Sequence, residues 1–330
     1  MRAPVALLAI LLCTAATAPA APAYHVAESI AGPDGGWDYA RVDASGRHLF
    51  VARGDAVTRI DLASGKVSSI GAIEHGHAVM PLPDGRLIVT SGTDGTVRFI
   101  DAADGHELAK LATGRKPDAA ITDADGARAF VMNSDSGTVT QIDTATMRAT
   151  RTIPVKQALE YAAIEGDRLY INNEDLNEIE TVDVAKGVAG APIALPGCEG
   201  PTGLALDAAH GRLISSCANG KAAIVDARAR KLVGLVDIGR GPDAVILDAA
   251  RNLAFIPCGK DGVLDILALG SGPVTRVGRV VTERGAKTGA VDTKTGTVYL
   301  PSARFTPPKQ PDGRSAPVPG SFHILVVRPS

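Results

Sequence analysis

Short runs of alternating apolar and polar residues recur along the chain at a nearly constant spacing. Five of these runs end in an apolar residue followed by aspartate, and the closing residues are Asp61, Asp101, Asp143, Asp183 and Asp226. Successive aspartates are 40, 42, 40 and 43 residues apart. Alternation with a period of two is typical of β-strands, and the chain shows no comparable helical period. The pattern therefore predicts a repeat built from strands.

Each repeat contains four such runs, separated by turns rich in Gly, Asp and Asn. In the first repeat the runs cover residues 38–42, 48–52, 57–61 and 65–70. Gly, Asp and Asn are the residues that tight turns between antiparallel strands require. The first run of each repeat is rich in small residues, which is expected of a strand that lies innermost. Two further copies are less regular and carry Ala268 and Val326 where the others carry aspartate.

Seven repeats of this size account for nearly all of residues 24–330. A period of about 40–45 residues with four strands is the size of a β-propeller blade. The predicted fold is all-β: one seven-bladed β-propeller domain over 24–330, with four antiparallel strands in each blade. The last repeat ends at Ser330 without a fourth strand, whereas residues 24–30 form a strand with no blade of their own. We expect this N-terminal strand to complete the last blade and so to remove an open sheet edge.

Residues 1–23 have the pattern of a signal peptide. Arg2 precedes an apolar run at 5–12, and Ala-Pro-Ala follows at 18–20 and again at 21–23. Signal peptidase requires small residues of this kind. The pattern predicts cleavage and export to the periplasm or beyond. A membrane anchor is the alternative, but the apolar run is too short to span a bilayer. Acylation of Cys13 is a second alternative, although Leu12 precedes it where small residues are usual.

Composition narrows the classes of partner. The formal net charge is −2, so there is no electrostatic case for nucleic acid as the main partner. Aromatic residues make up only 4% of the chain, which weakens a stacking platform for carbohydrate or single strands. No later segment has the 18 consecutive apolar residues of a membrane span. We expect a monomer that binds a small molecule or a protein at one mouth of the propeller.

The repeat resembles that of the YncE-like, or YVTN-repeat, seven-bladed propeller family. The third repeat carries the resemblance best, with Lys116-Pro117-Asp118-Ala119, then 130–133 (Phe-Val-Met-Asn), then 139–143 (Val-Thr-Gln-Ile-Asp). Gly241-Pro242-Asp243-Ala244 and Gly200-Pro201 match the start of the innermost strand. The resemblance covers the whole chain after residue 23 and implies an exported binding or scaffold protein. It also implies an alternative, because related propellers include metal-dependent lactonases.

Polar residues gather where the innermost strand begins and the second strand ends. These positions lie at the same end of a blade, so seven blades place two rings around one mouth of the channel, where propeller ligands commonly bind. The first ring is Asp38, His77, Asp118, Tyr161 with Glu160, Thr202, Asp243 and Thr288; the second is Arg53, Ser91, Asn133, Asn173, Cys217, Cys258 and Ser302. The predicted ligand-binding residues are Asp38, His77, Asp118, Asn133, Glu160, Asn173, Asp243 and Arg304.

Two sets of these residues could hold a divalent metal ion, the only cofactor that the sequence suggests. Asp38, His77 and Asp118 come from successive blades, and carboxylate and imidazole can share such an ion. The alternative is that each aspartate only caps its own turn. A second set, Asn133, Asn173, Glu160 and Asp243, offers the oxygen ligands that suit Ca²⁺ or Mg²⁺ and that propeller lactonases use. The alternative there is that the two asparagines are structural strand-end residues.

Three cysteines follow the signal peptide, so at most one disulfide can form within the chain. Cys198 and Cys217 lie at the same end of the fifth blade and are the favoured pair, with no disulfide as the alternative. A bridge between Cys217 and Cys258 would join neighbouring blades and require Cα atoms within about 7 Å. No histidine adjoins these cysteines in the sequence, the nearest being His210, and there is no G-x-S-x-G, CxxCH or phosphate-loop motif.

One insertion breaks the regular spacing. Residues 303–321 contain five prolines and lengthen the connection within the last repeat. This segment begins with Ala303 and Arg304, and residues 276–330 carry nine basic against three acidic residues. Because the connection lies at the mouth defined above, it could act as a lid, and Arg304 could meet an anionic group of a ligand. The alternative is a surface loop without a role in binding.

Overall fold

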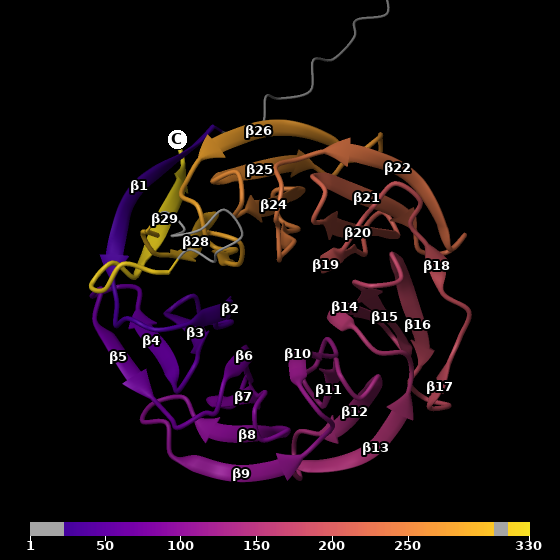
Figure 1. Ribbon diagram of the computed structural model, residues 1–330, viewed down its shortest axis with the longest axis horizontal. Coiled ribbons are helices and arrows are strands. Elements are labelled where there is room, and N and C mark those ends of the chain that lie inside the picture. Colours follow the sequence, from indigo (N-terminus) through magenta and orange to yellow (C-terminus); the bar gives the residue numbers. More distant parts are fainter. Residues whose placement is uncertain (1–22, 307–315) are drawn as a thin grey trace, which may run out of the picture.

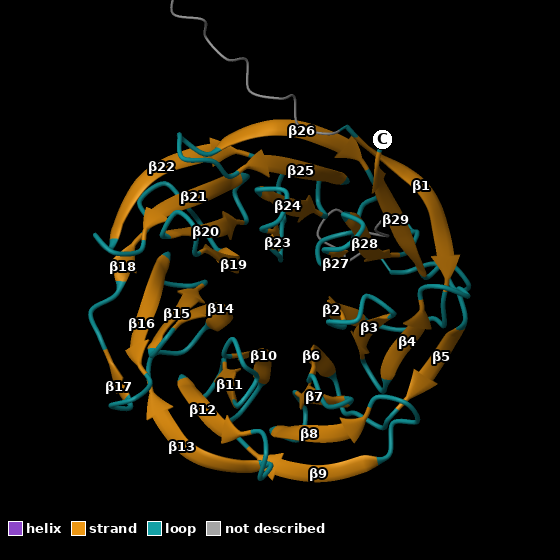
Figure 2. Cartoon of the chain, turned by 180° about the vertical axis from the view of Figure 1, so that it is seen from behind, coloured by secondary structure: helices purple, strands orange, loops and turns teal. Residues whose placement is uncertain are grey.

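The computed structural model describes residues 23–306 and 316–330. In this part of the chain seven antiparallel sheets stand in a ring around a central channel (Figure 1). Viewed from behind, the ring consists of strands and loops only (Figure 2). The predicted all-β, seven-bladed propeller is therefore confirmed. The signal-peptide prediction lies outside the described residues except for Ala23, and so does the segment 307–315 of the proline-rich insertion.

The strands follow the predicted order from the channel outward. The first three blades are β2 (Trp37–Val42), β3 (His48–Arg53), β4 (Val57–Asp61) and β5 (Val67–Ile70); β6 (Gly76–Pro81), β7 (Arg86–Ser91), β8 (Thr96–Asp101) and β9 (Glu107–Ala112); and β10 (Pro117–Thr122), β11 (Arg128–Asn133), β12 (Thr138–Asp143) and β13 (Arg148–Pro154). The fourth is β14 (Leu159–Glu165), β15 (Arg168–Asn173) and β16 (Glu178–Asp183), and its outer strand is divided into β17 (Val188–Ala189) and β18 (Ile193–Ala194).

The remaining blades repeat the pattern, and the innermost strands of the sixth and seventh are shorter. The fifth is β19 (Pro201–Asp207), β20 (Arg212–Cys217), β21 (Lys221–Asp226) and β22 (Lys231–Asp237); the sixth is β23 (Ile246–Asp248), β24 (Leu253–Cys258), β25 (Val263–Ala268) and β26 (Thr275–Val281). The seventh contains β27 (Ala290–Asp292), β28 (Thr297–Ser302), β29 (His323–Pro329) and β1 (Tyr24–Ala31). None of the described segments forms a helix that could cross a membrane.

The ring closes as predicted, because β1 is the outer strand of the seventh blade. It pairs antiparallel with β29, from Tyr24 opposite Pro329 to Ala31 opposite His323. The two ends of the described chain therefore lie side by side in one sheet (Figure 1). This pairing covers an edge that β29 would otherwise present to solvent.

The repeated aspartate has a structural purpose: it caps the turn between the third and fourth strands. Asp61 Oδ1 accepts hydrogen bonds from the backbone N–H groups of Ala63, at 3.1 Å, and Ser64, at 3.0 Å. Aspartate satisfies turn amides in this way without tertiary partners. The irregular copies lack such a turn. A longer connection follows Ala268, and Val326 lies in a strand whose outer neighbour comes from the other end of the chain.

The apolar core lies between the blades and away from the channel. The third residue of the second strand is large and buried in every blade: Phe50, Ile88, Phe130, Tyr170, Ile214, Phe255 and Tyr299. These side chains belong to clusters that join neighbouring sheets. Burial of apolar area at about 25 cal/mol per Å² stabilises the packing of blade on blade. Polar residues at the mouths of the channel can therefore vary without loss of this core.

Candidate functional site at one mouth of the channel

In five of the seven blades, a β-bulge places the polar residues of the ring at the start of the innermost strand. In β2, Trp37 pairs with Arg53 and Ala40 pairs with Val51, so three residues advance against two on the partner strand. Asp38 and Tyr39 lie in the resulting bulge. The same shift falls at equivalent positions of β6, β10, β14 and β19. A bulge bends the strand and re-aims its side chains, which is why these residues can turn toward the channel.

The register corrects two positions of the predicted ring. Ala290 pairs with Tyr299 as Ile246 pairs with Phe255, so Lys287, and not the predicted Thr288, is the equivalent of Asp243. The sequence alignment placed Tyr161 at the position of Asp38, with Glu160 beside it. In the structure the bulge of β14 lies between Leu159 and Ala162, so Glu160 is the equivalent of Asp38 and Tyr161 the equivalent of Tyr39. The misplacement is by one residue, because an extra residue in a bulge leaves no mark in the alternation of apolar and polar positions.

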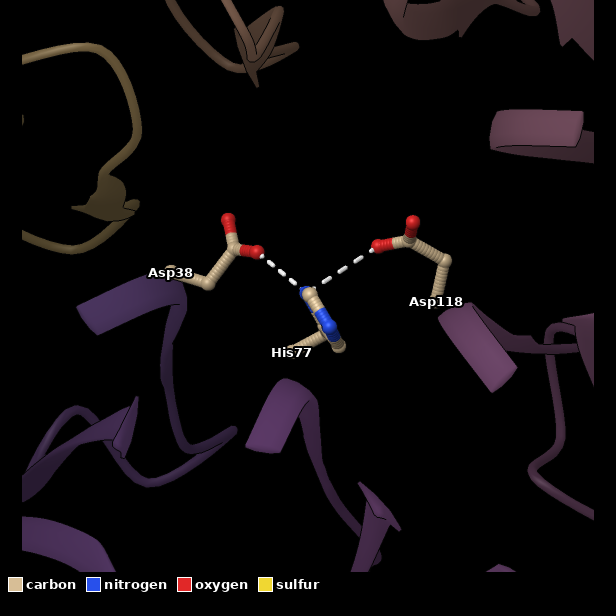
Figure 3. A group of neighbouring side chains, drawn as sticks. All are labelled: Asp38, His77 and Asp118. Atoms are coloured by element: carbon tan, nitrogen blue, oxygen red, sulfur yellow. Dashed lines mark hydrogen bonds and ion pairs between the residues drawn. The ribbon is translucent and has the colours of Figure 1, made fainter. Parts of the chain in front are cut away.

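Asp38, His77 and Asp118 converge at this mouth. His77 Nδ1 lies 2.8 Å from Asp38 Oδ2 and 3.3 Å from Asp118 Oδ1, between the two carboxylates (Figure 3). Their side chains are 16%, 13% and 8% exposed for Asp38, His77 and Asp118. One donor atom from each lies within 4.8 Å of the others. One imidazole nitrogen and two carboxylate oxygens at this spacing suit a divalent metal ion.

Two atoms of this cluster are buried without a hydrogen-bond partner among the described residues: Asp38 Oδ1 and His77 Nε2. A buried polar atom without a partner is costly, so such atoms are rare in folded proteins. Asp38 Oδ1 therefore has coordination capacity that the protein itself does not use.

Burial and like charge shift the protonation equilibria of the site. Burial, with the charges of Asp243 and Asp118 acting in the same direction, raises the pKa of Asp38 to about 6. The hydrogen bond with His77 and the charge of Lys287 oppose this rise in part. Burial also raises the pKa of Glu160 well above its usual value, with further contributions from Asp118 and Asp243. For His77 burial by itself lowers the pKa, but the hydrogen bond with Asp38 and the charge of Asp118 outweigh it and raise the pKa. The mouth thus carries more negative charge than it readily accommodates.

Two lysines offset part of this charge. Lys116 Nζ lies 3.2 Å from Asp118 Oδ2, and Lys287 Nζ lies 2.5 Å from Asp243 Oδ2. The charge of Asp243 raises the pKa of Lys287, in spite of burial. We call the group Asp38, His77, Asp118, Glu160 and Asp243, with these two lysines, the carboxylate mouth. Four carboxyl groups face two lysines there.

The sequence analysis missed both lysines as site residues, although one signal was present. In the fifth and sixth blades a glycine with positive φ, 59° at Gly200 and 67° at Gly241, precedes the proline that starts the blade. In the third blade Lys116 takes this place and holds φ at 50°. A residue with a side chain is strained in this conformation, and such strain clusters at functional sites. His75 and Ala158 hold the same place, with φ at 63° and 62°, so this signal marks the end of the channel at which Lys116 lies but does not single out the lysine.

Three predicted residues lie apart from the carboxylate mouth. Asn133 is fully buried, and its side chain is used within its own blade, where Oδ1 accepts from Gly114 N at 3.0 Å. Asn173 Nδ2 donates to the carbonyl of Gln157 at 3.0 Å. Both asparagines thus have the structural role given above as the alternative. Arg304 is exposed, and among the described residues no ion pair involves its side chain.

Cys198 and Cys217 form a disulfide, with Cα atoms 5.4 Å apart. This is the pair that the sequence favoured, and it attaches the loop before the fifth blade to β20. Cys258 is free and buried, and burial raises the pKa of its thiol. A thiol that remains protonated is a poor nucleophile. The described cysteines therefore have structural roles.

Comparison with known proteins supports the fold and goes no further. No protein-family model and no curated protein matches the chain. Among solved structures, a chain of Kuenenia stuttgartiensis hydrazine synthase is 16% identical with a TM-score of 0.71, covering 88% of this chain and 96% of that one. A chain of the mitotic checkpoint complex is 14% identical with a TM-score of 0.75, covering 98% of each. At these identities the likeness establishes a shared propeller fold alone.

Proposed function

We propose that the protein is an exported, monomeric binding propeller of the YncE-like kind, whose ligand docks at the carboxylate mouth. One observation carries the proposal: Asp38, His77 and Asp118 bring three donor atoms within 4.8 Å of one another. The excess of carboxylates favours a cation as ligand. A divalent metal ion fits best, either bound alone or as the bridge to a small molecule or protein.

The electrostatics of the mouth support a cation. The neighbouring carboxylates of Asp243 and Asp118 help to raise the pKa of Asp38. A divalent ion would relieve this repulsion, and it would also satisfy Asp38 Oδ1, which is buried without a partner. Opposite charge within about 4–6 Å favours the ionised carboxylate. Binding of the ion and deprotonation of the site would therefore reinforce each other.

Export is supported by two further features. Residues 1–23 have the charge, apolar run and small residues of a signal peptide. The disulfide between Cys198 and Cys217 is of a kind that persists in oxidising compartments such as the periplasm. The YVTN-type pattern of the repeat belongs to the same proposal, since that family is typically exported.

Calorimetric titration of the purified protein with Zn²⁺, Mn²⁺, Ca²⁺ and Mg²⁺ tests this function. We expect one of these ions to bind with a stoichiometry of one, and His77→Gln to abolish the binding. His106→Gln is the matched control, because His106 belongs to a second, exposed group with Asp101 and Asp104. Absence of binding by the unsubstituted protein, or an equal loss in the His106→Gln variant, would contradict the proposal.

A metal-dependent hydrolase of the lactonase type is the second candidate, and Glu160 is the observation that favours it. Its raised pKa would let this carboxyl group carry a proton at a pH where ordinary glutamates are ionised, as a general acid requires. The test is hydrolysis of a panel of lactones by the metal-loaded protein. Turnover that Glu160→Gln abolishes without loss of metal binding would favour the hydrolase. Absence of turnover at saturating metal would favour the binding module.

A further inference from the structure

The opposite mouth of the channel holds a cavity of about 510 Å³ with a different character. It is lined by residues from the later parts of the innermost strands of all seven blades, whereas the carboxylate mouth is built from their first residues. Its walls are mainly aliphatic, with Met80, Ile121, Leu206 and Val291 among them. We call it the apolar mouth.

Arg41 is the only charged side chain among the described residues that line the apolar mouth. No aspartate or glutamate lines it, and in the described part of the chain no hydrogen bond or ion pair involves the Arg41 guanidinium. Its Cζ atom lies 5.3 Å from the centre of the Tyr161 ring. Burial lowers the pKa of Arg41 to about 10, while the interaction with Tyr39 partly offsets this effect. The guanidinium is therefore still charged at neutral pH.

A charged guanidinium without a counter-ion is unusual in an apolar cavity. Desolvation of a charge is expensive, and proteins ordinarily pair such groups with a carboxylate. Three innermost strands end on this side in an aspartate, at Asp207, Asp248 and Asp292, but none of these lines the cavity. They do not meet this need, because Asp207 pairs with Arg212, Asp248 pairs with Arg251, and Asp292 accepts a hydrogen bond from Thr295. Tyr39 and Tyr161 lie between the two mouths, with ring centroids 4.8 Å apart. The cavity therefore offers a fixed positive charge, an aromatic support beneath it and aliphatic walls around it.

We propose that the apolar mouth binds a small organic monocarboxylate, with the carboxylate on Arg41 and an aliphatic body against the walls of the cavity. A guanidinium presents paired donors that match a carboxylate, and the pairing is strongest where water is excluded. Because the cavity carries one positive charge, it favours a ligand with one negative charge. A phosphate monoester or a dicarboxylate would bring a second charge for which the described lining has no partner. The volume is within the range of small-molecule sites.

The test compares three eight-carbon probes on the purified protein by isothermal titration calorimetry: octanoate, 1-octanol and octylamine. They share an aliphatic body and differ in the charge of the head group. We expect octanoate to bind at one saturable site, at least tenfold tighter than either of the other two. Equal affinity for octanoate and octanol would overturn the proposal, because it would leave Arg41 without a role. Absence of saturable octanoate binding would overturn it as well.

Substitution of the arginine locates the site. Arg41→Gln should weaken octanoate binding at least tenfold, and Arg41→Lys should weaken it less, because the charge is kept and the paired donors are lost. Arg148→Gln is the matched control, since Arg148 is an exposed arginine in the outer strand β13. Octanoate affinity that survives Arg41→Gln, or that falls equally in Arg148→Gln, would refute the site. If the Arg41 variants do not fold, the comparison of the three probes on the unsubstituted protein still tests the proposal.

Discussion

The rings of Tyr39 and Tyr161 meet in the central channel, with centroids 4.8 Å apart and planes tilted by 54°. They come from β2 and β14, which face each other across the ring (Figure 1). At the equivalent bulge position the second and third blades carry Ala78 and Ala119. Two large rings therefore fill the middle of the channel. They divide it into a mouth rich in carboxylates and a mouth whose charge is a single arginine.

This contact between the two rings predicts a stability effect for Tyr161→Ala. Removal of a buried aromatic side chain costs about 3–5 kcal/mol in free energy of unfolding. We expect about 3 kcal/mol here, because Tyr161 is 8% exposed and the channel can admit water. Tyr161→Phe keeps the ring and should change stability by less than about 1 kcal/mol. Denaturant unfolding measures both, and an alanine variant as stable as the unsubstituted protein would show that the rings do not support the channel.

The closure of the ring predicts that deletion of residues 24–31 unfolds the protein. The deletion removes β1 and leaves β29 with an open edge. It also removes Tyr24, whose ring centroid lies 5.0 Å from that of Phe255 in the neighbouring blade. Ser29→Ala, an exposed change within β1, should leave the melting temperature unchanged. Thermal unfolding followed by circular dichroism is the measurement, and a truncated chain that melts normally would contradict the role of β1.

The architecture followed from the sequence because blades repeat and repetition averages out local ambiguity. The 40-to-43-residue spacing of aspartates and the unpaired strand at residues 24–30 were sufficient to predict seven blades and their closure. Strand boundaries followed from the turns. A bulge is different, since one extra residue alters which side chain faces the channel without altering composition. That is why Glu160 and Tyr161 were assigned one position apart from their true places.

The chemistry of the two mouths was harder to predict than the strands. Asp38, His77 and Asp118 were recognisable because they occupy the same point of successive repeats. Lys287 was not, because the sequence alignment placed the next residue, Thr288, at that point of the seventh repeat. Arg41 lacks a counter-ion because none of the other six blades places a carboxylate in the described lining of the apolar mouth. Such a property belongs to the closed ring as a whole and not to any one repeat.

Lys287 predicts a pH-dependent loss of stability on substitution. The pKa of Lys287 is raised, so its charge contributes stability at every pH below its unfolded value of about 10.5. Lys287→Met leaves Asp243 and Asp38 without that charge. Loss of one partner of a fully buried pair costs about 3–5 kcal/mol, but the Lys287 side chain is 45% exposed, so solvent screens this pair. We expect about 1–2 kcal/mol at pH 8. At pH 5 the loss should be smaller, because Asp38, with a pKa of about 6, is then already protonated.

Lys231→Met is the matched control for this substitution, because Lys231 is exposed in the outer strand β22. It should change the free energy of unfolding by less than about 0.5 kcal/mol at either pH. Denaturant midpoints at pH 5 and pH 8 give the comparison. A Lys287→Met variant that loses equal stability at both values would show that the lysine acts by packing and not by charge.

Protons and metal ions compete for the carboxylate mouth, which predicts how metal affinity varies with pH. Asp38 has a pKa of about 6, and the pKa of His77 is raised above 6.5, so both must lose protons to coordinate an ion. Metal affinity should therefore rise between pH 5 and pH 8, with net proton release that is greatest at the acidic end. Calorimetry in two buffers of different ionisation enthalpy measures the number of protons released.

The stability of the metal-free protein should move in the opposite direction over the same range. The raised pKa of Asp38 imposes a cost that develops as pH rises from its unfolded value of about 4 to its folded value of about 6. The raised pKa of His77 gives stability that is present below about 6.5 and is lost as pH rises through the folded value. Metal binding opposes both effects, so the metal-induced rise in melting temperature should widen with pH. Asp38→Asn removes one of the two protons and should flatten this dependence, whereas a shift independent of pH would place the ion elsewhere.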